Sequence, residues 1–367
     1  MIAISAKSAF IKNRTGLEEY SYQLIKNIIK LSKRNNTLKD IVFYSNKWPE
    51  WENDFDDINI EVLRSRYLWS QGRLAWKIFW DKPDIFFNPE QLLPISSPDK
   101  SIITVHDLAY ERLPIYYTKK QQIYLRFITK GAVKRAKKII AVSQNTANDL
   151  INLYNVPSRK IKVIYHGLPL IDSTDEQIKD DIAIHNLKGS YILYIGRIEI
   201  KKNIINLIRG FESFKQKYKK SQLKLILAGK KGFEYQKIKE QIKLSNYFKD
   251  IIELDYVDEK TKFALIKRAK ALVLPSFYEG FGIPVIEAQN FGIPVITSNI
   301  SSLPEITSGS AILINPHDAE GIGHAIYNII YNSKIRKLLI QKGYNNVKKF
   351  SWEKTAKETL DLILSLK

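Results

Sequence analysis

The sequence LVLPSFYEGFGIPVIEA, residues 272–288, has the order of a strand, a loop and a helix. Its first residues, as far as Pro275, form an apolar run that is typical of a strand buried in a parallel sheet. The loop carries Gly280 and Gly282. A helix is expected to begin near Pro284, because a proline in the first helical turn loses no hydrogen bond. This order predicts one unit of a doubly wound α/β fold.

The same stretch carries groups that suit a phosphate and a sugar. The two glycines let backbone N–H groups approach a ligand beside the positive end of the helix dipole, which is a geometry that binds phosphate. Glu279 lies in the loop and Glu287 about one turn into the helix, so both carboxylates can face the same ligand. Carboxylates are good acceptors for hydrogen bonds from sugar hydroxyls.

A second element, GRIEIKKN at residues 196–203, follows the first strand expected in the C-terminal half. After Gly196, it brings the cations Arg197 and Lys202 close to a strand end. Arginine binds a diphosphate bidentately and lysine acts as a point charge, so the pair can neutralise a diphosphate. Glu199 and Lys201 are expected to be surface residues.

Apolar runs alternate with amphipathic segments along the whole chain, which predicts two parallel sheets wound with helices. Ligands in such sheets bind at the carboxyl ends of the strands. The expected strands are residues 2–5, 41–44, 84–87, 101–105, 139–142, 162–165, 191–195, 223–228, 251–254, 271–275, 294–297 and 311–314. The expected helices of the first half are residues 17–33, 73–80, 118–136 and 144–153. We expect a first domain over 1–170, an acidic linker over 171–190 and a second domain over 191–350.

The composition limits the function classes. The 367 residues include no cysteine, which excludes disulfides and thiolate metal sites. The N-terminus lacks the pattern of a signal peptide, and no apolar run approaches the length of a membrane span. We therefore expect a cytoplasmic protein. The net charge of +20 suits nucleic acid, an anionic membrane or a phosphorylated substrate, and a general bias toward lysine is the alternative explanation.

Two regions leave their roles open. Residues 119–138 contain eight Lys or Arg and no acid, interleaved with apolar residues. This pattern fits a helix that lies on the anionic inner face of the cytoplasmic membrane. It also fits a helix that covers the sheet and exposes its lysines to solvent. Trp69, Trp76 and Trp80 have helix-compatible spacing, which favours core packing over stacking against an acceptor.

Taken together, the motifs resemble those of glycosyltransferase family 4, whose members are retaining enzymes of the GT-B fold. In the first half, the matching segments are TGLEEY (15–20), TVHDL (104–108) and AVS (141–143). Near the terminus, FSW (350–352) resembles the entry to the family's last helix, which implies that residues 351–367 pack on the first domain. One departure is that the loop at Gly16 has a single glycine where many members have two.

The resemblance implies the following roles. Arg197 and Lys202 neutralise the diphosphate of a nucleotide-sugar, and the loop at Phe281 and Gly282 supplies N–H groups to sugar or phosphate. Glu279 holds a hydroxyl of the donor sugar, Glu287 holds the ribose hydroxyls, and His106 lies near the reacting carbon and the acceptor. Gly16 and Gly280 complete the donor site with Gly196, and the base is read near Tyr256 and Val257. The acceptor attacks on the face of the leaving group, without a cofactor or an essential metal.

Among such enzymes, the residues of the motifs resemble those of mannosyltransferases that make bacterial surface polysaccharides. These enzymes use GDP-mannose as the donor and a glycan or lipid-linked acceptor. A UDP-sugar donor stays open, as does an epimerase or hydrolase on the same fold. Without the resemblance, His106 at a strand end could be an ordinary core residue. Asp54 and Asp56 form an Asp-x-Asp pattern, but their acidic loop suggests a surface and no metal site. We expect no nucleic-acid partner, because no recognised module is present.

Overall fold

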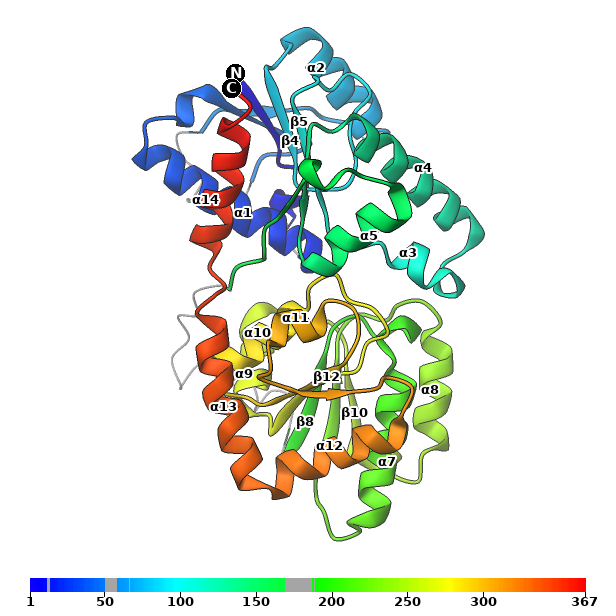
Figure 1. The fold of residues 1–367 in the computed structure, drawn as a ribbon. Helices are drawn as coiled ribbons and strands as arrows, with labels where there is room; N and C mark the ends of the chain where they lie inside the picture. Colours follow the sequence, from blue (N-terminus) through cyan, green and yellow to red (C-terminus); the bar gives the residue numbers. More distant parts are fainter. Residues whose placement is uncertain (12–13, 50–57, 66, 169–186, 188) are drawn as a thin grey trace. The chain divides into compact units, whose positions relative to one another are not determined.

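The computed structural model describes residues 1–11, 14–49, 58–65, 67–168, 187 and 189–367. Asp54, Asp56 and nearly all of the expected linker, 171–190, lie outside the described residues. The chain divides into two compact units, which are residues 1–169 with 350–367, and residues 170–349. Each unit has its own parallel sheet covered by helices (Figure 1).

The sheet of the first unit has seven parallel strands in the order β3-β2-β1-β4-β5-β6-β7. These strands are β1 (Ile2–Ser5), β2 (Ile41–Ser45), β3 (Ile60–Val62), β4 (Ile85–Asn88), β5 (Ser101–Val105), β6 (Lys138–Ala141) and β7 (Ile161–Val163). The α-helices of this unit are α1 (Gly16–Arg34), α2 (Ala75–Asp81), α3 (Ala109–Arg112), α4 (Lys119–Arg135), α5 (Gln144–Tyr154) and α14 (Trp352–Leu364).

One face of this sheet is covered by α1 and α14, which lie side by side in Figure 1. A capping box of Thr15 and Glu18 starts α1, because their side chains satisfy the first free backbone N–H groups. The last helix is fastened to the first unit by Thr355, whose hydroxyl donates to the Tyr165 carbonyl at 2.7 Å. At Gly167, a Cβ atom would lie 2.1 Å from the Trp352 nitrogen, so the backbone needs glycine to pass.

The opposite face is covered by α2, α3, α4 and α5, whose apolar residues share one core cluster. Trp69 belongs to this core and is 5% exposed. Trp76 and Trp80 do not, since they are 58% and 62% exposed, so the expectation of core packing is wrong for these two residues. The physical reason is that the buried side of α2 is formed by Ala75 and Ile78, and Ile78 packs into this core.

The sheet of the second unit has six parallel strands in the order β10-β9-β8-β11-β12-β13. They are β8 (Tyr191–Ile195), β9 (Lys224–Ala228), β10 (Ile251–Leu254), β11 (Ala271–Leu274), β12 (Val295–Ser298) and β13 (Ile312–Ile314). The α-helices are α7 (Ile204–Lys217), α8 (Tyr235–Leu244), α9 (Glu259–Arg268), α10 (Ile283–Asn290), α11 (Leu303–Thr307), α12 (Ala319–Tyr331) and α13 (Ser333–Val347).

Two doubly wound parallel sheets are the fold class expected from the sequence, and that expectation is confirmed. Most strands begin and end within one or two residues of their expected bounds. β3 was not expected, because its three half-buried residues form no apolar run.

Candidate functional site

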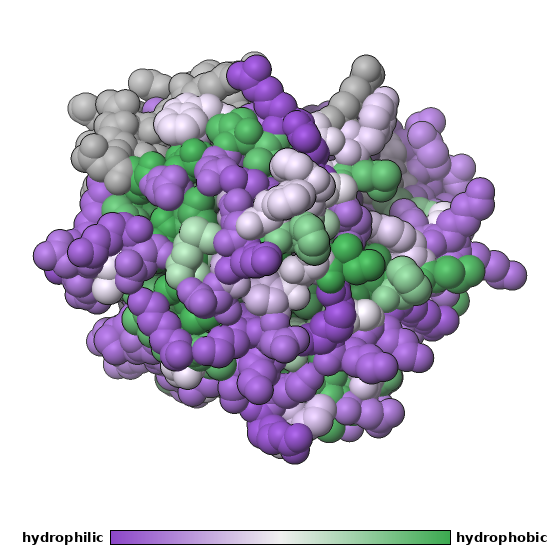
Figure 2. Space-filling view, turned by 90° about the horizontal axis from the view of Figure 1, so that it is seen from above, coloured by the Kyte–Doolittle hydropathy of each residue, from purple (hydrophilic) through white to green (hydrophobic). Residues whose placement is uncertain are grey.

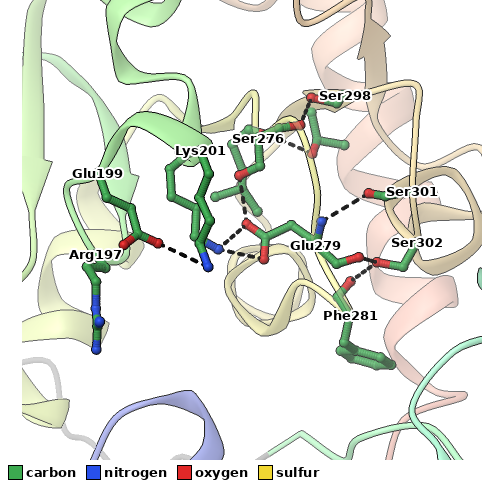
Figure 3. A network of polar contacts seen from close by, with 12 residues as sticks. Arg197, Glu199, Lys201, Ser276, Glu279, Phe281, Ser298, Ser301 and Ser302 are labelled. Carbon is green, nitrogen blue, oxygen red and sulfur yellow. Dashed lines mark hydrogen bonds and ion pairs between the residues drawn. The ribbon is translucent and has the colours of Figure 1, made fainter. Parts of the chain in front are cut away.

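The loops that follow β8, β11 and β12 meet at the carboxyl edge of the second sheet, because neighbouring parallel strands end on the same side. Figure 3 shows their polar side chains in one network. Lys202 of the first loop donates to both carboxylate oxygens of Glu279, each at 2.8 Å. Ser276 also donates to the same carboxylate, at 2.7 Å. The two residues that the sequence assigned to separate motifs are therefore joined by an ion pair that is mostly shielded from water.

Serine side chains fix the backbone of the loop between β11 and α10, which contains Gly280 and Gly282. Ser302 donates to the carbonyls of Glu279 and Phe281 at 2.9 and 3.0 Å. The Glu279 N–H donates to Ser301 at 3.2 Å (Figure 3). Ser298, at the end of β12, donates to the Ser276 carbonyl at 2.7 Å. The loop is therefore held in one conformation by the adjacent strand end, which is a form of preorganisation.

Asn203 is a structural residue of the site whose role the motif did not reveal. Its backbone is left-handed, with φ +60°, and its buried amide donates to the carbonyls of Pro275 and Pro316 at 2.9 and 2.6 Å. The Phe277 N–H donates to the Lys201 carbonyl at 3.1 Å. One asparagine thus ties the start of α7 to the ends of β11 and β13. The only sequence feature that pointed to Asn203 was its position directly after Lys202, a predicted site residue.

Two of the predicted glycines have conformational reasons to be glycine. Gly196 and Gly282 have φ values of +145° and +102°, which side-chain-bearing residues rarely adopt. At Gly229, a Cβ atom would lie 1.9 Å from the Gly196 carbonyl oxygen, so the loops after β8 and β9 pass in direct contact. Arg197 follows Gly196, is exposed, and lies apart from Lys201 in Figure 3.

The carboxylate of Glu287 forms an ion pair with a different lysine, Lys262. The Glu287 side chain is 3% exposed, and Lys262 of α9 donates to it at 2.6 Å. The two predicted carboxylates therefore carry separate charge partners, Glu279 with Lys202 and Glu287 with Lys262. Lys262 was not found from the sequence, because nothing in the pattern of α9 separates it from the other lysines.

The expectation that Glu199 and Lys201 are surface residues is wrong. Glu199 is 6% exposed and Lys201 is half-buried, and their side chains form an ion pair at 3.4 Å. The turn between β8 and α7 folds back against the loop after β9, which covers Glu199: at Gly232 a Cβ atom would lie 2.7 Å from that of Glu199.

The predicted base-reading residues lie at the end of β10. Tyr256 is 40% exposed, and the Nζ atom of Lys230 lies 4.5 Å from its ring centroid. Val257 is half-buried. Gly280 and Phe281 lie in the loop between β11 and α10, and Phe281 is buried. The structure therefore places these residues in loops at the strand ends of the second sheet.

The predicted residues of the first unit lie at the carboxyl edge of the first sheet. Gly16 opens α1, is exposed, and has no atom within 4 Å of the position of a Cβ. His106 follows β5, and its ring packs edge-on against Tyr20, with ring centroids 4.6 Å apart. His166 and Trp352 complete this aromatic group.

His106 is held as a neutral ring. Its Nε2 lies 2.9 Å from the Pro89 carbonyl, which can only accept, so Nε2 carries the proton. Burial lowers the pKa of His106 below its ordinary value, which favours the neutral form. Burial, together with the neighbouring His106, holds the pKa of His166 well below that value. A neutral His106 protonated on Nε2 presents Nδ1 as a hydrogen-bond acceptor.

Within the part of the chain that the structure describes, no group of three or more His, Asp or Glu side chains could hold a metal ion. The described helices include none that is long and apolar enough to cross a membrane.

The chain matches known proteins over most of its length. Residues 175–346 match the model of glycosyl transferases group 1, and residues 56–170 match that of glycosyltransferase family 4. O-antigen chain mannosyltransferase B of Escherichia coli is 26% identical over 364 residues, which cover 95% of both chains. O-antigen chain mannosyltransferase RfbU of Salmonella typhimurium is 33% identical over 231 residues, covering 62% of this chain and 60% of that one.

Solved structures share the fold. HepE of Anabaena, in complex with UDP-glucose, has a TM-score of 0.74, with coverage of 99% of both chains and 16% sequence identity. At this level of identity, the likeness concerns the fold alone. It agrees with the GT-B architecture that the motifs implied.

Proposed function

We propose that this chain, which belongs to the glycosyltransferases of group 1 and family 4, transfers mannose from GDP-mannose with retention of configuration. Glycosyl transfer itself follows from the family. The choice of mannose is supported by the relatives, since the two described above are O-antigen chain mannosyltransferases. By the same reasoning, we propose a glycan or lipid-linked acceptor in the synthesis of a surface polysaccharide.

The observation that carries the proposal is the ion pair of Lys202 with Glu279 at the carboxyl edge of the second sheet. A lysine held by a carboxylate in a partly buried loop is positioned before a ligand arrives. When a nucleotide-sugar binds, its diphosphate attracts the ammonium group of Lys202, and Glu279 becomes available to accept a hydrogen bond from a sugar hydroxyl. The same pair thus places the leaving group and the sugar next to each other.

The exposed Arg197 supplies a second positive charge for the diphosphate. As the bond to the sugar breaks, charge builds up on the leaving nucleotide, and both cations stabilise it more strongly than they stabilise the bound donor. Such differential stabilisation accelerates the reaction without an essential metal. Glu287, held by Lys262, accepts from the ribose hydroxyls.

His106 acts at the reacting carbon in this proposal. As a neutral ring with Nε2 bound to Pro89, it offers Nδ1 to a hydroxyl of the sugar or of the acceptor. The acceptor attacks on the face of the leaving group, and a phosphate oxygen takes its proton. The product keeps the anomeric configuration of the donor.

A UDP-sugar donor is the second candidate, supported by the UDP-glucose in the HepE structure. The experiment that separates the two measures the thermal stability of the protein with UDP, GDP, UDP-glucose and GDP-mannose. GDP and GDP-mannose are expected to raise the melting temperature, because a ligand that binds only the folded state stabilises it. A larger rise with the uridine nucleotides would overturn the choice of donor.

An enzyme that uses the nucleotide-sugar without an acceptor, a hydrolase or an epimerase, is the remaining alternative. It predicts free sugar or an epimerised nucleotide-sugar at full rate when no acceptor is present. For the transferase, product formation requires an acceptor, and NMR of the product identifies its anomeric configuration. We also propose a cytoplasmic site of action, with peripheral contact to the membrane through residues 119–138.

A further inference from the structure

Helix α2 exposes aromatic rings to solvent. Trp76, Phe79 and Trp80 are 58%, 59% and 62% exposed, although their type is usually buried. Their spacing of three and four residues places them on one face of the helix. The rings also contact one another, with centroids 6.1 Å apart for Trp76 and Trp80 and 5.6 Å apart for Phe79 and Trp80. Contiguous exposed apolar side chains of this kind indicate an interaction site.

Helix α4 exposes a second apolar group beside positive charge. Ile123, Tyr124 and Phe127 are 68%, 58% and 79% exposed. The helix has no acidic residue, and its exposed lysines are Lys119, Lys120, Lys130 and Lys134. Arg126 of α4 forms an ion pair with Glu111 of α3, which neutralises this one positive charge of the helix.

A single segment connects the two helices. The guanidinium group of Arg135, at the end of α4, donates to the Leu93 carbonyl at 2.7 Å and to the Ile95 carbonyl at 3.0 Å. Gln71, just before α2, donates to the same Leu93 carbonyl at 3.1 Å. Ile95 itself is 77% exposed. Because α2 and α4 also share one core cluster, both lie on the same face of the first sheet.

We propose that the two exposed groups, Trp76, Phe79 and Trp80 on α2 and Ile123, Tyr124 and Phe127 on α4, act together as one surface that inserts into the interface of an anionic lipid bilayer. Tryptophan and tyrosine suit the headgroup level of a bilayer, and apolar side chains enter the boundary with the acyl chains. The lysines of α4 then face the anionic headgroups. Figure 2 views the molecule from the end at which α2 lies in Figure 1, and hydrophobic side chains stand out there among hydrophilic ones.

The inference deepens the proposed function, on which it rests for the need to reach a lipid-linked acceptor. It adds α2 to residues 119–138 as a membrane-binding element, and it assigns most of the membrane affinity to the aromatic rings of α2. Charge complementarity favours a bilayer over a second copy of this chain, because two copies with a net charge of +20 repel each other. Nucleic acid also carries negative charge, but its phosphate backbone gives no binding partner to aliphatic side chains such as Ile123.

The test measures co-sedimentation of the 367-residue chain with vesicles of phosphatidylcholine and phosphatidylglycerol, and with vesicles of phosphatidylcholine alone. The variant replaces Trp76, Phe79 and Trp80 by serine, which leaves the core unchanged because the three rings are exposed. We expect the wild type to bind the anionic vesicles, and the variant to bind them at least about tenfold more weakly. A matched control replaces Leu244 and Phe248 of the second unit, which are 79% and 51% exposed, and should bind like the wild type.

Three outcomes would overturn the proposal. They are equal vesicle binding by the variant and the wild type, tighter binding to duplex DNA than to the anionic vesicles, and a wild-type dimer in sedimentation that the serine variant abolishes. Stabilisation by the nucleotide-sugar is measured in parallel and should be the same in all variants. Loss of vesicle binding with normal donor binding supports this surface even if the donor is not GDP-mannose.

Discussion

The carboxyl edges of the two sheets are both formed by parallel strands, but the side chains around the predicted site residues differ. In the second unit, the loops carry ion pairs, with Lys202 on Glu279 and Lys262 on Glu287. In the first unit, His106 lies among aromatic rings, against Tyr20 and near His166, and the ion pair of Arg14 with Glu19 lies at the start of α1. Parallel sheets supply the position, and the side chains at the strand ends decide what is bound there.

The difference indicates a division of roles. Paired charges in a partly buried loop suit a ligand with a diphosphate, because the cation is already held in place. A neutral histidine among aromatic rings gives little attraction to an anion, but it orients a hydroxyl through Nδ1. We therefore expect changes in the second unit to affect both the binding of the donor and turnover, and changes in the first unit to affect turnover alone.

The largest effect is expected for Lys202→Met, which removes the charge that faces the leaving nucleotide. Turnover should fall about 10²–10³-fold, as for the loss of one preorganised donor to a developing negative charge. Steady-state assays of sugar transfer measure it. The neighbouring Lys201→Met is the matched control, since Lys201 pairs with Glu199 instead. Equal losses in both variants would mean that general positive charge, rather than the pair with Glu279, is what matters.

His106→Gln comes next and examines the first unit. Glutamine keeps hydrogen-bonding capacity but not the ring that packs on Tyr20. Turnover should fall about 10²-fold, as expected when a reacting group loses the side chain that orients it. A comparison with Asp107→Asn separates the ring from its neighbour in sequence. Normal turnover in His106→Gln would assign this histidine to core packing alone.

A smaller effect is expected for Glu287→Ala, which acts on the nucleotide. Losing the buried acceptor should weaken donor binding by about 1–3 kcal/mol. Titration calorimetry with GDP-mannose gives the value. Lys262→Met is the informative companion, because it leaves the buried Glu287 carboxylate without its charge partner. Unchanged affinity in both variants would show that the ribose binds elsewhere.

The smallest effect concerns pH and the first unit. The pKa values of His106 and His166 are lowered in the folded state, so the unfolded chain binds more protons at acidic pH. The free energy of unfolding should therefore fall as the pH drops below about 6.5, by about 1.4 kcal/mol for each pH unit by which a pKa is lowered. Denaturant unfolding at several pH values measures it. His166→Phe should flatten this dependence, and an unchanged slope would assign it to other groups.

The sequence predicted the strand ends and the motif residues because both depend on local patterns. Apolar runs bounded by glycine and proline place β8 and β11 almost to the residue. The same patterns do not say which side of a short helix faces the core, so Trp76 and Trp80 were expected inside. On α2, the smaller Ala75 and Ile78 are buried instead, and Ile78 belongs to the core cluster.

The polar partners could not be predicted, because they come from distant parts of the chain. Ser301 and Ser302 fix the loop of Glu279 from the end of β12, 22 and 23 residues away. Lys262 reaches Glu287 across 25 residues. Glu199 is buried by a neighbouring turn, which no periodicity indicates.

The division of roles is tested most directly by the affinity for GDP-mannose of Lys202→Met and His106→Gln, measured side by side by titration calorimetry. Our account predicts that the dissociation constant rises about tenfold or more in Lys202→Met, because a charge-assisted contact to the diphosphate is lost. In His106→Gln it should stay within about twofold of the wild type, since a neutral ring does not hold the diphosphate. Unchanged affinity in Lys202→Met, or an equal loss in His106→Gln, would contradict the assignment of the donor to the charged edge of the second sheet.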